Sequence, residues 1–299
     1  MTVAQATGVA SIPLGLTVRD AIARSAAYLG ERGVEGPRLD AELLLAKVLR
    51  LTRLELHLAA ERPLARDEIE RWRSLVARRG RREPLAYVLG EWGFRRLTLS
   101  TDRRALVPRP ETEVVVERAL ELVADVAGPR VLDAGTGTGA IALAIADERS
   151  DADVTALDRS NDALTLAREN ARRIGLVGRV RFEHGDFRER LPRGPYDLVI
   201  SNPPYVLAEE WPGLAPEIRE WEPREALVGG LEVLAALAAR ARDVLDEDGW
   251  LVVETAEQRS EAAVAVVRAV GYADVAARAD LAGRPRVVEG RARASRAAT

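Results

Sequence analysis

The stretch Val131-Leu132-Asp133-Ala134-Gly135-Thr136-Gly137-Thr138-Gly139-Ala140-Ile141-Ala142-Leu143 joins a buried strand to a helix through a glycine-rich turn. Glycines in such a turn let the backbone approach a ligand closely, because they carry no Cβ. The same residues also satisfy the glycine pattern of dinucleotide-binding enzymes. The turn therefore predicts a nucleoside-binding site and leaves the class of nucleoside open.

The chain that continues from this turn alternates strands with helices. We predict strands over 130–134, 153–158, 180–184, 196–201, 249–254, 273–277 and 285–288. We predict helices over 140–147, 162–174, 231–245 and 260–270. This alternation indicates an α/β fold with a mostly parallel, Rossmann-like sheet of seven strands, which is covered by helices on both faces and binds ligands at the carboxyl ends of its strands.

The chain before the sheet has a different pattern. Thr17 is a helix N-cap, and helical spacing recurs over 39–49 and 66–79, which indicates a small helical bundle with a role in recognition. β-type residues around glycines follow and indicate a β-hairpin connector. The expected organisation is a helical domain at 1–83, a connector at 84–106, the α/β domain at 107–290 and a flexible tail at 291–299.

The segment Val107-Pro108-Arg109-Pro110-Glu111-Thr112-Glu113 precedes an amphipathic helix that we expect to reach residue 127. A proline suits the first helical position, and the two glutamates suit the positive first turn of a helix. The segment is explained equally well as a helix start and as a loop that closes over a ligand.

Composition narrows the chemistry further. A length of 299 residues suggests two domains, and an apolar share of 47% is ample for a core. The absence of cysteine excludes thiolate chemistry, and only His57 and His184 could supply imidazole, so we expect no metal site. Residues 1–16 do not resemble a leader and no segment is long enough to span a bilayer, which predicts a soluble cytoplasmic protein without membrane contact.

The charge distribution bears on nucleic-acid binding. A net charge of −3 argues against bulk electrostatic capture of nucleic acid, so we expect no stable nucleic-acid binding. The charge is nevertheless uneven, because six arginines lie within residues 71–82. This basic stretch is either a solvated helix face or a docking surface for a partner or RNA.

Polar or aromatic residues follow four of the predicted strands. Asp158 is placed to bind ribose hydroxyls or to cap the next helix, and Phe187 lies against a base or in the core. Asn202-Pro203-Pro204-Tyr205 must end a strand, because proline cannot continue a ladder and holds the preceding residue extended. The amide of Asn202 and the carbonyl of Pro203 beside an aromatic ring form a clamp for a planar NH2 group. Dinucleotide-binding enzymes have no evident use for such a clamp, whereas an enzyme that transfers a methyl group to a planar nitrogen needs one.

Asn202-Pro203-Pro204-Tyr205 together with Gly135-Thr136-Gly137-Thr138-Gly139 resembles S-adenosylmethionine-dependent methyltransferases that modify exocyclic or amide nitrogens. Further blocks narrow this resemblance, namely Pro108 to Glu113, Trp221-Glu222-Pro223, Gly229-Gly230 and Asp280 to Val288. With these blocks the whole chain resembles the peptide chain release factor N5-glutamine methyltransferases, the PrmC/HemK family, which have a class I methyltransferase sheet.

The resemblance implies S-adenosyl-L-methionine as the cofactor and class-1 peptide chain release factors as the partners. It implies that the glycine turn cradles the methionine part of the cofactor, that Asp158 binds the ribose and that Phe187 contacts the adenine. Asn202 then touches both cofactor and substrate. The glutamine of the Gly-Gly-Gln loop is expected to be held by Asn202, Pro203, Pro204 and Tyr205, of which Asn202, Pro203 and Tyr205 are the candidate catalytic residues.

Three other interpretations can be weighed on the residues. The same clamp serves an amino methyltransferase that acts on adenine or guanine in DNA or RNA, although net acidity and the lack of a broad basic domain with interleaved aromatics argue against it. A non-catalytic, cofactor-binding adaptor is a second alternative, and an intact clamp disfavours it. The third, an NAD dehydrogenase, fails because the sequence offers no proton-transfer residue near a hydride site, and only nicotinamide binding would revive it.

Overall fold

The computed structural model describes residues 15–292, which divide into two compact units. The first, which we call the helical unit, contains the described residues up to Gly90 together with Pro216–Trp221. The second, the sheet unit, contains Glu91–Ala215 and the described residues from Glu222 onward. Most of the expected C-terminal tail, residues 293–299, and most of residues 1–16 lie outside the described range.

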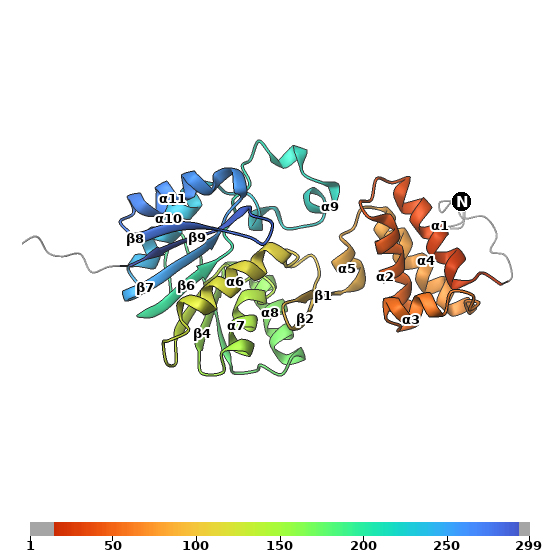
Figure 1. Ribbon diagram of the computed structural model, residues 1–299, viewed down its shortest axis with the longest axis horizontal. Helices are drawn as coiled ribbons and strands as arrows, with labels where there is room; N and C mark the ends of the chain where they lie inside the picture. Colours follow the sequence, from red (N-terminus) through yellow and green to blue (C-terminus); the bar gives the residue numbers. More distant parts are fainter. Residues whose placement is uncertain (1–14, 293–299) are drawn as a thin grey trace, which may run out of the picture. The chain divides into compact units, whose positions relative to one another are not determined.

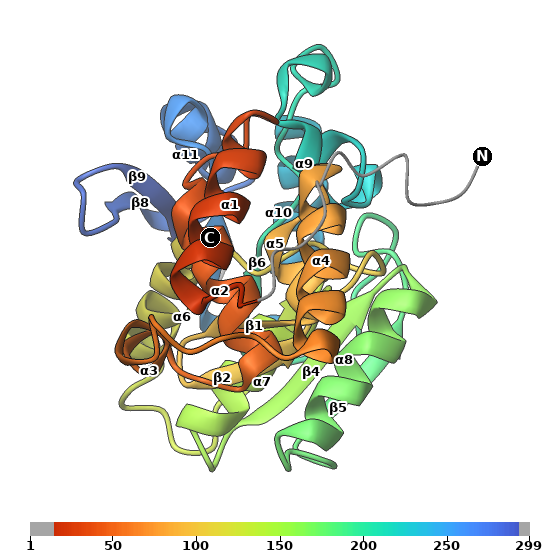
Figure 2. The same ribbon diagram turned by 90° about the vertical axis from the view of Figure 1, so that its right-hand side faces the viewer.

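The helical unit is built from α1 to α5. Its helices span Val18–Gly30, Pro37–Leu49, Arg53–Leu58, Arg66–Gly80 and Leu85–Leu89, and α9, Pro216–Arg219, joins them from later in the chain. Helices α1, α2 and α4 pack against one another (Figure 2). Thr17 caps α1 as predicted, because its hydroxyl accepts from the Asp20 amide while the Asp20 carboxylate accepts from the Thr17 amide.

The connector differs from the prediction in its first half. Residues 84–89 were expected to belong to the hairpin connector, but Leu85–Leu89 form helix α5. Pro84 is the N-cap of this short helix, and Gly90 is its C-cap with a positive φ of 72°. The hairpin itself follows as β1, Glu91–Phe94, and β2, Leu97–Ser100. Helix α3 was not predicted either, although Thr52 and Glu55 form a capping box at its start.

The sheet unit contains a seven-stranded sheet in the order β5-β4-β3-β6-β7-β9-β8. Its strands are β3 Arg130–Ala134, β4 Asp153–Asp158, β5 Val180–His184, β6 Tyr196–Ser201, β7 Leu245–Glu254, β8 Ala273–Ala279 and β9 Pro285–Arg291. Neighbours from β5 to β7 run parallel, and β9 is antiparallel to both β7 and β8. The predicted fold class is therefore confirmed.

Helices cover both faces of this sheet. They are α6 Pro110–Leu122, α7 Ala140–Glu148, α8 Asn161–Arg173, α10 Leu231–Arg242 and α11 Ser260–Ala269. Figure 1 shows α6, α7 and α8 on one side of the sheet and α10 and α11 on the other. Successive strand residues enter opposite cores, so Val131 packs in the core with α6 and α7 whereas Leu132 packs in the core with α10 and α11.

Strands β3, β4, β5 and β6 begin and end at the predicted residues. The predicted boundaries of later elements need correction. Residues 243–245 were expected to end a helix, but α10 stops at Arg242 and Leu245 pairs with Tyr196 of β6. Arg291 was expected to begin the tail, but it pairs with Trp250 as the last residue of β9. Pairing between strands that are distant in sequence decided both boundaries, so local spacing could not fix them.

Candidate active site

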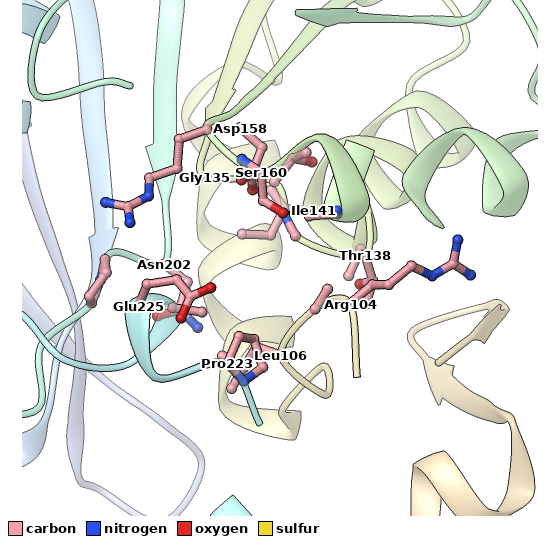
Figure 3. A pocket seen from close by; sticks show the side chains of 18 of the residues that line it. Arg104, Leu106, Gly135, Thr138, Ile141, Asp158, Ser160, Asn202, Pro223 and Glu225 are labelled. Atoms are coloured by element: carbon pink, nitrogen blue, oxygen red, sulfur yellow. Dashed lines mark hydrogen bonds between the residues drawn. The ribbon is translucent and has the colours of Figure 1, made fainter. Parts of the chain in front are cut away.

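A cavity of about 440 Å³ lies at the carboxyl ends of the parallel strands in the sheet unit (Figure 3). Strand β3 pairs with β4 on one side and with β6 on the other, so the chain reverses direction across the sheet at this point. Open α/β sheets bind ligands at such a switch point. Of the predicted site residues, those lining the cavity are Gly135, Thr136, Gly137, Thr138, Asp158, Phe187, Asn202 and Pro204.

The glycine turn after β3 forms one wall of the cavity. Gly135 and Gly137 have φ values of 86° and 55°, which residues with a Cβ rarely adopt. Gly139 has a different role, because it is not among the lining residues. A Cβ at Gly139 would lie 3.0 Å from Leu143 Cδ1 and 3.1 Å from the Cβ of Ala167, so this glycine allows α7 to pack closely against α8.

A buried carboxylate holds the glycine turn, and sequence reasoning assigned it no role. Asp133 Oδ2 accepts hydrogen bonds from Thr136 Oγ1 at 2.6 Å and from the Ala142 amide at 3.1 Å. Burial raises the pKa of Asp133 to about 7. The side chain ties the end of β3 to both the turn and the first residues of α7, so it shapes the cavity from below without lining it.

Asp158 joins the ends of β3 and β4. Its Oδ2 accepts from the Gly137 amide at 2.8 Å and its Oδ1 accepts from the Ser160 amide at 2.8 Å. Burial raises the pKa of Asp158 above its usual range. Helix α8 is capped by Ser160, whose hydroxyl accepts from Ala163, so the alternative role of Asp158 as the cap of that helix does not hold. Its carboxylate borders the cavity.

The residues after β5 place an aromatic ring in the cavity wall. Phe187 is buried and lies beside the turn, since a Cβ on Gly135 would be 3.5 Å from its ring. Asp186 also lines the cavity, but its carboxylate is engaged by Arg188, which holds the pKa of Asp186 below its usual range. An aromatic ring and an acidic group thus lie just after the carboxyl end of β5, in the wall of the cavity.

The Asn-Pro-Pro-Tyr segment follows β6 and divides into two parts. Asn202 and Pro204 line the cavity, whereas Pro203 is buried and is not among the lining residues. Tyr205 turns its hydroxyl to Glu254 Oε1 at 3.2 Å. Ser201, the last residue of β6, donates to the Ala134 carbonyl at 2.5 Å and so joins the ends of β6 and β3.

A later loop supports the backbone of this segment. Val206 pairs with Val228, and the next residue, Gly229, approaches Pro204 so closely that a Cβ there would lie 2.3 Å from the Pro204 carbonyl oxygen. Pro223, Arg224 and other residues before this contact line the cavity as well. The backbone at Gly229 thus lies directly against the backbone at Pro204, which leaves no room for a side chain at position 229.

The proline-rich segment before α6 starts that helix, as one of its two interpretations predicted, and it also lines the cavity. Pro110 is the first residue of α6, and residues 104–109 line the cavity together with Thr112. Glu222 holds this segment in place, because its carboxylate accepts from the Val107 amide at 3.2 Å and pairs with Arg109 at 2.5 Å. The segment is both a helix start and part of the wall.

Besides Asp133, sequence reasoning missed Thr112 and Glu254, which lie next to Asn202 and Tyr205. Thr112 Oγ1 donates to Glu254 Oε2 at 2.6 Å and accepts from Asn202 Nδ2 at 3.3 Å. Burial raises the pKa of Glu254 to about 7. The only signal for Thr112 was its place in the proline-rich block, and Glu254 could be noticed only as an acidic residue at a strand end.

Two negative observations apply to residues 15–292. No group of three or more His, Asp or Glu side chains is arranged to hold a metal ion in that range. No helix there is both long and apolar enough to cross a bilayer.

The fold and the site first define a class. Residues 125–272 match a methyltransferase domain model. The crystal structure of the hMettl16 catalytic domain, in complex with the MAT2A 3′UTR hairpin 6, aligns with a TM-score of 0.55 over 72% of this chain and 81% of that chain, and its 14% identity shows a shared fold alone. The protein is a methyltransferase.

Sequence comparison then gives the family. Residues 20–90 match the PrmC N-terminal domain. The release factor glutamine methyltransferase of Geobacter sulfurreducens is 39% identical over 92% of this chain and 96% of its own length. The enzyme of that name from Deinococcus radiodurans is 41% identical over 92% of this chain and 99% of its own length. The chain belongs to the release factor glutamine methyltransferase family.

Proposed function

We propose that this protein transfers a methyl group from S-adenosyl-L-methionine to the side-chain amide nitrogen, N5, of the glutamine in the Gly-Gly-Gln loop of class-1 peptide chain release factors. The observation that carries the proposal is the position of Asn202. Its amide lies in the cavity wall at the end of β6, and Thr112 orients it. Membership of the family supports the glutamine as the group that this amide would hold.

The cavity fits the proposed cofactor. The positive φ angles at Gly135 and Gly137 bring backbone close to the cavity where the methionine part would lie. Asp158 offers acceptors for ribose hydroxyls, and Phe187 offers a flat apolar face for adenine. The bound cofactor would supply an electrophilic methyl group on a sulfonium, and the protein's own task is to present a nitrogen to it.

Amide nitrogen is a poor nucleophile, because its lone pair is delocalised into the carbonyl. Asn202 Oδ1, in the cavity wall, would take one N–H of the substrate amide and help to fix its plane. Pro203 is not among the lining residues, so its carbonyl, the second acceptor that the sequence predicted, is not part of this proposal. Such positioning lowers the barrier through proximity and pre-arranged hydrogen bonds, on a scale of up to roughly 7–11 kcal/mol. A strong base is not required, since the nitrogen becomes acidic once it has been methylated.

The helical unit, which matches the PrmC N-terminal domain, is proposed to recognise the release factor. Nucleic-acid capture through the basic stretch 71–82 has little support, because several of its arginines are already paired. Arg71 pairs with Asp67, Arg78 with Glu83, and both Arg79 and Arg82 with Glu217.

Label transfer tests the proposal. The protein is incubated with methyl-labelled S-adenosylmethionine and, separately, with a release factor, a Gln-to-Ala variant of its Gly-Gly-Gln loop, DNA and RNA. We expect label on the unmodified release factor alone. Label on nucleic acid alone would contradict the proposal and would favour an amino methyltransferase, and no label on any of them would favour a non-catalytic adaptor.

A further inference from the structure

A buried carboxylate lies behind Asn202 and contacts it only through another side chain. Glu254 ends β7 and is 3% exposed. Its Oε2 accepts from Thr112 Oγ1 at 2.6 Å, and its Oε1 accepts from the Tyr205 hydroxyl at 3.2 Å. Thr112 Oγ1 also lies 3.3 Å from Asn202 Nδ2. Three residues from different parts of the chain thus form a linear series, which we call the Glu254 relay: Glu254, Thr112 and Asn202.

The chemistry of the groups sets the direction of this relay. An ionised carboxylate has no hydrogen to give, so both hydroxyls must donate to Glu254. Thr112 has a single hydroxyl hydrogen, and once that hydrogen points to Glu254 only lone pairs remain for Asn202. Asn202 therefore turns its Nδ2 toward Thr112, and its Oδ1, at the other end of the amide, is directed away from Thr112.

We propose that Glu254 is a positioning residue that, through Thr112, decides which end of the Asn202 amide is available to the substrate. The proposal rests on the proposed function, in which Asn202 Oδ1 accepts an N–H from the glutamine amide. Glu254 itself lines no part of the cavity, whereas Thr112 and Asn202 do.

Replacement of Glu254 by glutamine reverses the relay. The arrangement that gives every hydroxyl an acceptor has the new amide N–H donating to Thr112, Thr112 donating to Asn202 Oδ1, and Tyr205 donating to the new amide oxygen. If the new amide N–H faced Tyr205 instead, the partly buried Tyr205 hydroxyl would lose its acceptor, which is unfavourable. In the reversed relay Asn202 presents Nδ2 to the substrate amide, and two donors face each other.

Protonation of Glu254 has the same effect as the glutamine substitution. Burial, with a smaller contribution from Glu111 on α6, raises the pKa of Glu254 to about 7, while the hydrogen bonds from Thr112 and Tyr205 and, less strongly, the charge of Arg286 on β9 oppose the shift. Burial also raises the pKa of Tyr205, with Arg109 opposing, so that its hydroxyl stays protonated throughout. The relay therefore reverses as the pH falls through about 7.

Kinetics on the full-length enzyme test the relay. We expect Glu254→Gln to lower kcat for release factor methylation by on the order of 10²-fold, the scale of a lost catalytic hydrogen bond, with an unchanged Kd for S-adenosylmethionine. In a Thr112→Val background the same substitution should have no further effect, because the relay is already broken. Thr112→Ser keeps the hydroxyl and should keep most of the activity. Additive losses in the double variant would contradict the proposal.

A matched control separates positioning from stability. Glu289 on β9 is also a buried carboxylate, paired with Arg118 and Arg278, and it does not line the cavity. Glu289→Gln should lower the melting temperature without changing kcat. A loss of kcat equal to that of Glu254→Gln would show that any buried carboxylate lost from this sheet has the same effect, and would overturn the inference.

A readout without substrate distinguishes this inference from the proposed function. The side-chain amide resonance of Asn202, assigned with Asn202→Asp, should titrate with a midpoint near pH 7 in the wild-type protein and should not titrate in Glu254→Gln. If the resonance titrates but no release factor is methylated, the relay stands and the proposed substrate is wrong. If the wild-type enzyme is active but the resonance is the same in both proteins, the inference is wrong.

Discussion

At the scale of single residues, the site depends on side chains whose hydrogen-bond capacity is divided between the fold and the ligand. Asp158 uses both oxygens on backbone amides and still borders the cavity. Asn202 uses its nitrogen on Thr112, which leaves its oxygen for a substrate. Removal of the Asn202 side chain should therefore affect methyl transfer much more than it affects cofactor binding.

Asn202→Ala should abolish methyl transfer and leave much of the affinity for S-adenosylmethionine. The variant removes one acceptor for the substrate amide, while the glycine turn, Asp158 and Phe187 remain in place. Label transfer measures the first effect and calorimetric titration of the cofactor measures the second. Full activity in this variant would contradict the clamp, and loss of cofactor binding alone would assign Asn202 to the cofactor.

Glu254 should make folding stability depend on pH. Its pKa in the folded protein, about 7, lies above its ordinary value of 4.5. Its contribution to stability is therefore fully present below pH 4.5 and is lost as the pH rises through 7. At about 1.4 kcal/mol per pKa unit, the free energy of unfolding of Glu254→Gln relative to the wild type should increase by up to about 3 kcal/mol between pH 4.5 and pH 8.

Urea denaturation of both proteins at the two pH values checks this expectation. Burial also raises the pKa of Asp133. Asp133 is present in both proteins, so its contribution to the pH dependence of stability cancels in the comparison. If the two proteins differ in free energy of unfolding by the same amount at both pH values, Glu254 has an ordinary pKa. A variant that is more stable and less active would show that this carboxylate is retained for function rather than for folding.

At the scale of elements, the loop that follows the Asn-Pro-Pro-Tyr segment returns to support it. Gly229→Ala should lower activity strongly, because the new Cβ would lie 2.3 Å from the Pro204 carbonyl oxygen and the backbone beside Asn202 would have to move. Gly213→Ala is the matched control in the same loop, since its Cβ would meet nothing within 4 Å. Steady-state rates and melting temperatures of the two variants test this. Similar activities would show that the contact at Pro204 is dispensable.

The elements of the sheet could be predicted from sequence, whereas several contacts between them could not. Strands β3, β4 and β6 have largely apolar runs that end at Gly135, Asp158 and Asn202, and β5 alternates apolar and charged residues before Gly185, so local pattern sufficed. Helix α5 was missed because Tyr87 and Val88 have β-type side chains, although Pro84 and Gly90 delimit a short helix. The bond between Thr112 and Glu254 joins residues 142 positions apart, and no local pattern encodes it.

At the scale of the whole molecule, the chain leaves the helical unit at Gly90 and returns to it for Pro216–Trp221. The sequence predicted a contiguous helical domain, and nothing in its spacing indicated the return. Glu217 on α9 pairs with Arg79 at 2.8 Å and with Arg82 at 2.6 Å, and Arg79 also pairs with Asp40. The basic stretch 71–82 thus owes part of its composition to a partner that lies far along the chain.

Glu217→Gln should destabilise the protein by about 1–3 kcal/mol, because it weakens charge-assisted hydrogen bonds to the buried Arg79. The arginine pairing holds the pKa of Glu217 below its usual range despite burial, so the effect should be present at pH 7 and should disappear as the pH falls through the lowered pKa. Glu61→Gln, which breaks an exposed pair with Arg19, is the control and should cost less than about 1 kcal/mol. Equal losses in thermal unfolding would contradict this assignment.

The return of residues 216–221 also limits how the protein can be engineered. A chimera that takes its helical unit from a relative as one N-terminal block would bring new partners for positions 79 and 82 but would keep the original residue at position 217. The six-residue segment has to be transplanted together with the N-terminal block, although more than a hundred residues of the other unit separate them in the gene. Recombination points for family shuffling therefore belong at three places in the chain, after residues 90, 215 and 221.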